Sequence, residues 1–194
     1  MRKNKNISAP TLRQIETELR KEEYRSSRKR ILRGSISTLI VIAAATVLIS
    51  TFLLPVLRIY GTSMTPALDA GDIVVTVRSG SYNRGDVIAF YYNNKVLIKR
   101  IIGLPGEWVD IDENGNVSVD GEILEEPYLT EKSQGEYDIE LPYQVPDGRY
   151  FIMGDHRRVS SDSRNSAVGC VSEEQIVGKL IFRVWPFSKI GIIG

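Results

Sequence analysis

The chain has 194 residues, with 25 Lys/Arg, 24 Asp/Glu and a formal net charge of +1, which is enough for one ordinary domain and an appendage. Its single cysteine, Cys170, excludes an internal disulfide framework. The small net charge hides an asymmetry, because residues 1–33 carry 11 Lys/Arg and 4 Asp/Glu whereas residues 58–194 carry 14 and 20. Glutamates alternate with the basic residues of the N-terminal part and break up any basic stripe, so we expect no nucleic-acid partner.

An uncharged segment, residues 34–57, separates these two parts. About 20 apolar residues suffice to cross a ~30 Å hydrocarbon core, and the run is too long for the apolar part of a cleaved signal. A buried core helix is the alternative, but polar residues would normally interrupt it on one face. We therefore expect a single transmembrane helix over residues 34–57. The basic cluster at residues 25–33 predicts that the tail, residues 1–33, is cytoplasmic and that residues 58–194 lie outside.

The part after the apolar run is typical of β-structure. Short runs rich in β-branched and aromatic residues predict strands, and Asn114-Gly115 is the strongest short hairpin signal. Residues 127–148 are polar and interrupted by Pro and Gly, which predicts an extended excursion. We expect a mainly β fold, with a compact antiparallel sheet domain on the membrane helix. The predicted strands lie within residues 72–77, 86–92, 95–102, 107–119, 149–153 and 172–187.

One stretch of this domain has the spacing of a calcium-binding loop. Asp110, Asp112 and Asn114 precede Gly115 as they would in an EF-hand. The bidentate carboxylate is due at position 121, which is glycine, and the flanks alternate like strands. We therefore expect a solvated hairpin tip here, and neither a metal nor a cofactor for the protein.

Ser63 is a candidate nucleophile that follows closely on the apolar run. A serine nucleophile needs a base that removes its proton at neutral pH, and the chain offers its one histidine, His156, or a neutral lysine. On a strand, Lys99 shares its face with Leu97 and Ile101, and such a desolvated lysine has a pKa lowered by up to about 3–5 units. The alternative is that Lys99 extends its amine to the surface. The strand pattern alone leaves both possibilities open.

Several motifs occur in order between about residues 60 and 186. They are "SMTPAL" from Ser63, "KRIIGLPG" from Lys99 and "MGDHRRVSSDSR" from Met153, together with the strand-like "GDIVVTV" and "IVGKLIFRVWP". In this order and spacing the chain resembles the bacterial type I signal peptidases, which are membrane proteases with a Ser/Lys dyad. The resemblance implies a signal-peptidase-like β domain.

The resemblance also implies roles for individual residues. Ser63 would be the nucleophile and Lys99 its general base. Ser160 would match the serine that hydrogen-bonds the lysine amine and orients it. Asp162 and Arg164 would match a structural carboxylate and arginine near the dyad, where a buried pair would hold the loop that carries Ser160.

The resemblance further implies how the substrate is held. Met64, Leu68 and Ile98 would line shallow apolar pockets for small side chains, and the peptide would add a strand to an exposed sheet edge. The backbone N–H of Ser63 would supply one oxyanion donor. Some family members supply a second donor from a serine two residues before the nucleophile, where this chain has Gly61.

The implied activity is that of a membrane-bound serine endopeptidase of the cell membrane, which removes signal peptides on the outer face. Its expected partners are signal-peptide-bearing precursors and membrane lipid, and the secretion translocon is a further candidate. The alternatives are a Ser/Lys self-cleaving protease, a non-catalytic membrane-tethered β module, and a hydrolase that uses His156 and Asp155. Adjacent strand residues point to opposite faces, so Asp155 would orient His156 poorly. His156 stands where the family usually has asparagine.

Overall fold

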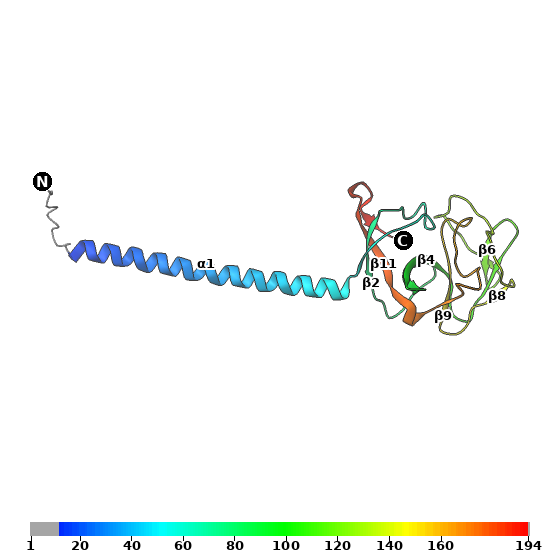
Figure 1. Ribbon diagram of the computed structural model, residues 1–194, viewed down its shortest axis with the longest axis horizontal. Helices are drawn as coiled ribbons and strands as arrows, with labels where there is room; N and C mark the ends of the chain where they lie inside the picture. Colours follow the sequence, from blue (N-terminus) through cyan, green and yellow to red (C-terminus); the bar gives the residue numbers. More distant parts are fainter. Residues whose placement is uncertain (1–11, 194) are drawn as a thin grey trace. The chain divides into compact units, whose positions relative to one another are not determined.

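The computed structural model describes residues 12–193, and expectations for residues 1–11 lie outside them (Figure 1). The first element is the helix α1, Leu12–Leu53, and the chain divides into two compact units after Ile49. Within the described part of the chain, no helix is both long and apolar enough to cross a membrane, so the expected span is not confirmed. Several large apolar side chains of α1 are exposed, namely Ile36, Leu39, Ile40, Val41, Ile42, Val47 and Leu48.

The helix α1 ends earlier than expected. The helix ends at Leu53, and Val56–Arg58 form the strand β1, so the uncharged run 34–57 is not helical throughout. Pro55 lies between the two elements and explains the change. A proline disfavours the helical conformation of the residue before it and has no N–H for the helix. Its carbonyl instead accepts the backbone N–H of Thr76 at 2.9 Å.

The β-rich unit consists of two sheets in which every strand pair is antiparallel. The larger sheet has the order β1-β2-β11-β3-β4-β9-β10, with β12 paired to β11, and the smaller has the order β7-β6-β5-β8. The larger sheet contains β2 (Ile73–Val77), β3 (Val87–Tyr92), β4 (Lys95–Gly103), β9 (Arg149–Met153), β10 (Val171–Ser172), β11 (Ile176–Trp185) and β12 (Gly191–Ile192). The smaller sheet contains β5 (Trp108–Ile111), β6 (Val117–Val119), β7 (Glu122–Ile123) and β8 (Tyr143–Gln144), and two short 3-10 helices occur at Glu173–Gln175 and Phe187–Lys189.

This architecture confirms the antiparallel β domain and the strands expected from alternation and β-branched content. The hairpin around Asn114-Gly115 joins β5 to β6. Asp112 accepts the backbone N–H groups of Asn114 and Asn116 at 2.9 and 2.8 Å, so its carboxylate closes the turn. The strands β1, β7, β8, β10 and β12 were not predicted, because two or three residues are too few to show a period.

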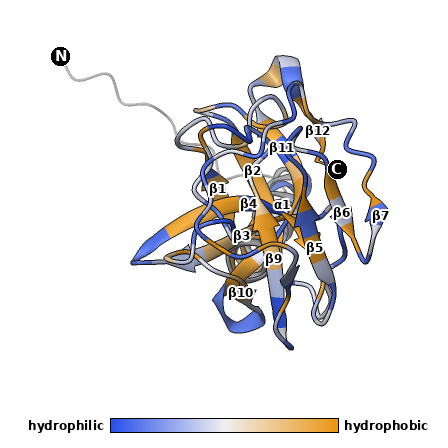
Figure 2. Ribbon diagram, turned by 90° about the vertical axis from the view of Figure 1, so that its right-hand side faces the viewer, coloured by the Kyte–Doolittle hydropathy of each residue, from blue (hydrophilic) through white to orange (hydrophobic). Residues whose placement is uncertain are grey.

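The hydrophobic core consists of three clusters, and the central strand β4 contributes to all of them. Ile98 packs with the cluster around Met64, Ile101 is buried in a second cluster, and Ile102 is buried in a third. Figure 2 shows that β4 and β9 are largely hydrophobic, as expected for strands covered by other parts of the fold. From Lys99 onward the side chains of β4 are buried on both faces, which fixes the direction of the polar groups in this part of the strand.

Candidate active site

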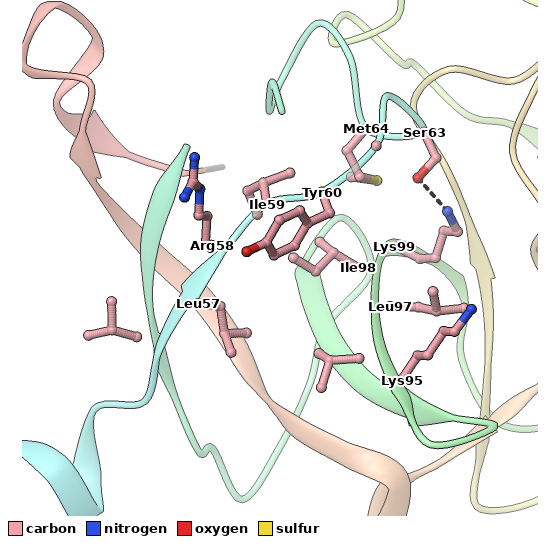
Figure 3. A pocket seen from close by; sticks show the side chains of 13 residues that line it. Leu57, Arg58, Ile59, Tyr60, Ser63, Met64, Lys95, Leu97, Ile98 and Lys99 are labelled. Carbon is pink, nitrogen blue, oxygen red and sulfur yellow. Dashed lines mark hydrogen bonds between the residues drawn. The ribbon is translucent and has the colours of Figure 1, made fainter. Parts of the chain in front are cut away.

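The two residues expected to react lie next to each other. Lys99 Nζ is 2.6 Å from Ser63 Oγ, although 36 residues separate them in sequence. In Figure 3 the two side chains point toward one another, Lys99 from β4 and Ser63 from the turn that follows β1. Ser63 is partly accessible, whereas Lys99 is only 3% exposed. This is the geometry of a nucleophile and base within hydrogen-bond distance.

The surroundings of Lys99 favour its neutral form. Burial lowers the pKa of Lys99 from 10.5 to about 8, while Asp162 opposes the shift, Arg164 adds to it and Asp155 opposes it. Desolvation is the main cause because removal from water penalises the ammonium form. A lysine with a pKa near 8 can accept the proton of a serine hydroxyl at mildly alkaline pH, which an ordinary lysine does poorly.

Ser160 lies beside the dyad but does not form the expected bond to the lysine. Among the described residues its buried Oγ has no hydrogen-bond partner. A Cβ added to Gly154 would collide with the Ser160 side chain and lie 2.5 Å from the Ser63 carbonyl oxygen. Glycine at position 154 thus lets the loop that carries Ser160 approach the nucleophile closely. A buried hydroxyl without a partner is uncommon in proteins and calls for an explanation.

Asp162 and Arg164 form a fully buried, bidentate ion pair, with Arg164 Nε and Nη2 at 2.8 and 2.9 Å from the two carboxylate oxygens. Asp162 also accepts the backbone N–H of Gly154 at 2.9 Å. Arg164 also donates to the carbonyls of Gln134 at 2.6 Å and Arg157 at 2.9 Å. The pair therefore connects the start and end of the loop 154–164 to the excursion between β7 and β8.

Two further buried ion pairs flank the site, and the sequence did not indicate them. Arg100 Nε and Nη2 bind Asp155 at 2.9 and 2.8 Å, and the Arg157 guanidinium binds the Glu126 carboxylate. The Tyr128 ring connects the two pairs, because its centroid lies 4.0 Å from the Arg100 guanidinium carbon and its hydroxyl donates to Glu126 at 2.7 Å. The sequence signal that could have revealed the second pair was the basic content of "DHRR", since a buried arginine needs an acidic partner.

A groove of about 610 Å³ runs past the dyad (Figure 3). Met64 and Ile98, two of the three expected pocket residues, line it. Leu68 does not line the groove, because it is fully buried in the cluster behind Met64. The remaining lining residues come from the two strands on either side of the groove and from the nucleophile turn: Val56, Leu57, Arg58, Ile59, Tyr60, Gly61, Ser63, Lys95, Val96, Leu97 and Lys99.

Both strands that border the groove present a free edge to it. Strand β1 pairs with β2 only, and β4 pairs with β9 from Arg100 onward, which leaves residues 95–99 paired with β3 alone among the described strands. Free backbone N–H and C=O groups along such edges can bind an extended peptide. The groove can therefore accept a peptide strand whose side chains enter apolar walls.

His156 and Asp155 do not form the relay that a Ser–His–Asp hydrolase requires. Both carboxylate oxygens of Asp155 bind Arg100. His156 Nδ1 lies 3.2 Å from Thr65 Oγ1, and the Ser63 hydroxyl is next to Lys99. The geometry thus favours the lysine over the histidine as the base.

Comparisons with known proteins find similarity to signal peptidases. Residues 32–185 match the family described as "Signal peptidase, peptidase S26". "Signal peptidase IB" of Staphylococcus aureus (strain COL) is 36% identical over 183 residues, which cover 84% of this chain and 93% of the relative. "Signal peptidase I" of Bacillus licheniformis is 34% identical over 182 residues, covering 87% and 97%. A crystal structure of a signal peptidase I from Enterococcus faecalis V583 is 31% identical, matches 52% of this chain and 97% of that chain, and has a TM-score of 0.45.

Proposed function

The chain belongs to the signal peptidase family, peptidase S26, and on this premise we propose that it is a membrane-bound serine endopeptidase that removes signal peptides from translocated precursors, with Ser63 as nucleophile and Lys99 as general base. The single observation that supports this assignment most directly is the 2.6 Å separation of Ser63 Oγ and Lys99 Nζ inside an apolar groove. The lowered pKa of Lys99, about 8, supports the role of base.

In the proposed mechanism, Lys99 Nζ takes the hydroxyl proton while Ser63 Oγ bonds to the carbonyl carbon of the scissile peptide. Lys99 then gives this proton to the leaving amine as the C–N bond breaks, which leaves an acyl ester on Ser63. A water loses a proton to Lys99 and attacks the ester, and the proton returns to Ser63 as the acid is released. The Ser63 N–H donates to the developing oxyanion. Gly61 occupies the position at which some family members have a serine that supplies a second donor. Its φ of +85° favours glycine.

Ser160 and the buried Asp162–Arg164 pair are proposed to support the dyad. The Ser160 hydroxyl is buried and has no partner among the described residues, so its oxygen is free to accept an N–H of the neutral lysine amine, whose single lone pair is left for the Ser63 proton. The ion pair holds the loop that carries Ser160 and contacts the Gly154 backbone. A charge-assisted, bidentate pair restricts such a loop more than a single neutral bond does.

Substrate recognition is proposed to combine strand addition with small apolar pockets. The free edges of β1 and β4 supply backbone groups to an extended peptide, and Met64 and Ile98 lie among the apolar lining residues. Leu68 would act through Met64, because it packs behind the groove. Pockets of this kind favour the small side chains that precede signal-peptide cleavage sites.

We also propose that the uncharged helical segment anchors the enzyme in the cell membrane, with a cytoplasmic tail and an external β domain. The basic residues before the segment support this orientation. The exposed side chains of Leu39, Ile40 and Ile42 support lipid as the covering medium. Protease added outside intact cells should digest residues 58–194 and spare the N-terminal tail. Protection of the β domain from outside would refute this topology.

The test of the activity is cleavage of a signal-peptide-bearing precursor by full-length protein in detergent micelles. We expect Ser63→Ala to produce no mature protein while its circular dichroism and thermal unfolding match those of the wild type. Ser81→Ala serves as the matched control, because Ser81 is an exposed serine outside the groove. Mature product from Ser63→Ala at the wild-type rate would refute the proposed nucleophile.

A further inference from the structure

His156, the only histidine of the chain, contacts the nucleophile turn through two separate groups. Its backbone N–H donates to the Ser63 carbonyl at 3.0 Å, and its ring Nδ1 lies 3.2 Å from Thr65 Oγ1. The side-chain contact joins residues 91 positions apart. The two contacts fall on either side of Met64, so His156 covers the turn that carries the nucleophile.

The hydrogen bonds around Thr65 determine which atom donates. Thr65 Oγ1 donates its proton to the Thr62 carbonyl at 2.8 Å. A hydroxyl has only one proton, so Thr65 Oγ1 can only accept a hydrogen bond from His156. The histidine must therefore carry a hydrogen on Nδ1, an assignment that follows from the network.

The Thr65 hydroxyl closes the turn that presents Ser63. The Thr62 carbonyl accepts both the backbone N–H of Thr65, at 3.2 Å, and its hydroxyl. Ser63 lies between these two residues, so the direction of its Oγ depends on the turn. A bond from His156 to the same hydroxyl restrains the turn from outside.

His156 is itself held firmly, because buried ion pairs fix the residues on both of its sides. Asp155 binds Arg100 through both carboxylate oxygens, and Arg157 binds Glu126 through two guanidinium nitrogens. The His156 ring is only partly buried, so it has no large packing role. A rigid backbone with a polar ring aimed at the turn suits a positioning function.

We propose that His156 is a positioning residue, which donates its Nδ1–H to Thr65 Oγ1 and thereby holds Ser63 Oγ in line with Lys99. This inference rests on the proposed Ser63–Lys99 chemistry. His156 exchanges no proton with the substrate, and its contribution is made through the turn. Removal of the donor should lower kcat and leave KM nearly unchanged, because His156 itself does not line the groove.

The test compares His156→Ala with His156→Asn in full-length protein in micelles, on a peptide that carries a cleavage site. Asparagine Nδ2 is separated from Cα by the same number of bonds as histidine Nδ1, so it can donate to Thr65. We expect kcat to fall about tenfold or more in His156→Ala, and to stay within about twofold of wild type in His156→Asn. Failure of asparagine to rescue kcat would overturn the proposal, as would a loss confined to KM.

Thr65→Val gives a second, independent route to the same contact. If His156 acts through the Thr65 hydroxyl, Thr65→Val should lower kcat, and His156→Ala should cost little more when added to it. Additive losses would overturn the proposal. Val159→Ala, an exposed change in the same loop, is the matched control and should behave as wild type. An active Ser63→Ala would refute the proposed function, whereas an inactive Ser63→Ala with a normal His156→Ala would refute only the positioning role.

Discussion

Lys99 Nζ lies 2.6 Å from Ser63 Oγ, and the lysine is buried whereas the serine remains accessible. In the proposed mechanism this arrangement places the proton acceptor behind the nucleophile, away from water, and leaves the reactive oxygen open to the groove. Strand β4 holds the lysine and the turn after β1 holds the serine. Because burial lowers the pKa of Lys99, the protonation of this amine is expected to control both activity and stability.

Peptide cleavage should rise with pH around a midpoint near 8, because the fraction of neutral Lys99 grows as pH passes its pKa of about 8. Leu97→Asp should move this midpoint upward, since Leu97 shares the strand face of Lys99 and a carboxylate there favours the ammonium form. The measurement is a pH–rate profile on a soluble peptide, with Leu97→Asn as the uncharged control. An unchanged midpoint in folded Leu97→Asp would mean that the rise does not report Lys99.

Lys99→Met should stabilise the fold at neutral pH while it abolishes cleavage. The pKa of Lys99 falls from 10.5 when unfolded to about 8 when folded, so the unfolded chain binds more protons between these values. Burial of Lys99 therefore lowers stability fully below about pH 8, by up to about 3 kcal/mol, and this cost vanishes as pH rises toward 10.5. Urea unfolding should show that Lys99→Met raises the free energy of unfolding strongly at pH 6.5 and only slightly at pH 10.5. Lys95→Met, at an exposed position of the same strand, should show no such pH dependence.

Ser160→Ala should lower activity and raise stability together. The Ser160 hydroxyl is buried and has no hydrogen-bond partner among the described residues, so its removal relieves an unmet desolvation cost of about 1 kcal/mol. Activity should fall severely if the hydroxyl orients the lysine amine, and Ser160→Thr, which keeps a hydroxyl, should be milder. The measurements are kcat and urea unfolding on the same preparations. Full activity in Ser160→Ala would exclude the supporting role.

The groove should prefer substrates with an acidic side chain upstream of the scissile bond. Apart from Lys99, its basic lining residues are Arg58 and Lys95, and among the described residues neither of these two has an ion-pair partner. The groove therefore carries positive charge, although the segment that contains it, residues 58–194, has more acidic than basic residues, with 14 Lys/Arg and 20 Asp/Glu. An ion pair between exposed side chains contributes up to about 1 kcal/mol, which corresponds to roughly a fivefold preference in kcat/KM.

Paired peptides that differ only in Glu or Lys, placed two to five residues before the cleavage site, measure this preference as a ratio of kcat/KM. Lys95→Glu and Arg58→Glu should each reduce or reverse the ratio, and high salt should weaken it. Arg78→Glu, an exposed cation outside the groove, is the matched control. Equal ratios in wild type and in both groove variants would show that the groove does not read charge.

The amino-acid sequence by itself determined the longer β-strands, the hairpin at Asn114-Gly115 and the identity of the candidate dyad. Strand alternation and turn residues depend on local backbone preferences, which neighbouring residues reveal directly. The motifs around Ser63 and Lys99 indicated the family because each motif is a short run of consecutive residues, which can be read directly from the sequence. Pro55 is a local signal for the end of the helix at Leu53, but the pairing of Val56 with Val75 of β2 is a contact between separate segments that no local pattern reveals.

Only the tertiary structure decided how the site is assembled. The lowered pKa of Lys99 requires the packing of several strands around one amine, and no local pattern measures that burial. The ion pair of Arg157 with Glu126 and the contact of His156 with Thr65 join segments 31 and 91 residues apart. Such partners are selected by the way all the strands and loops pack at once, so the positions of these side chains become defined only when the whole domain has folded.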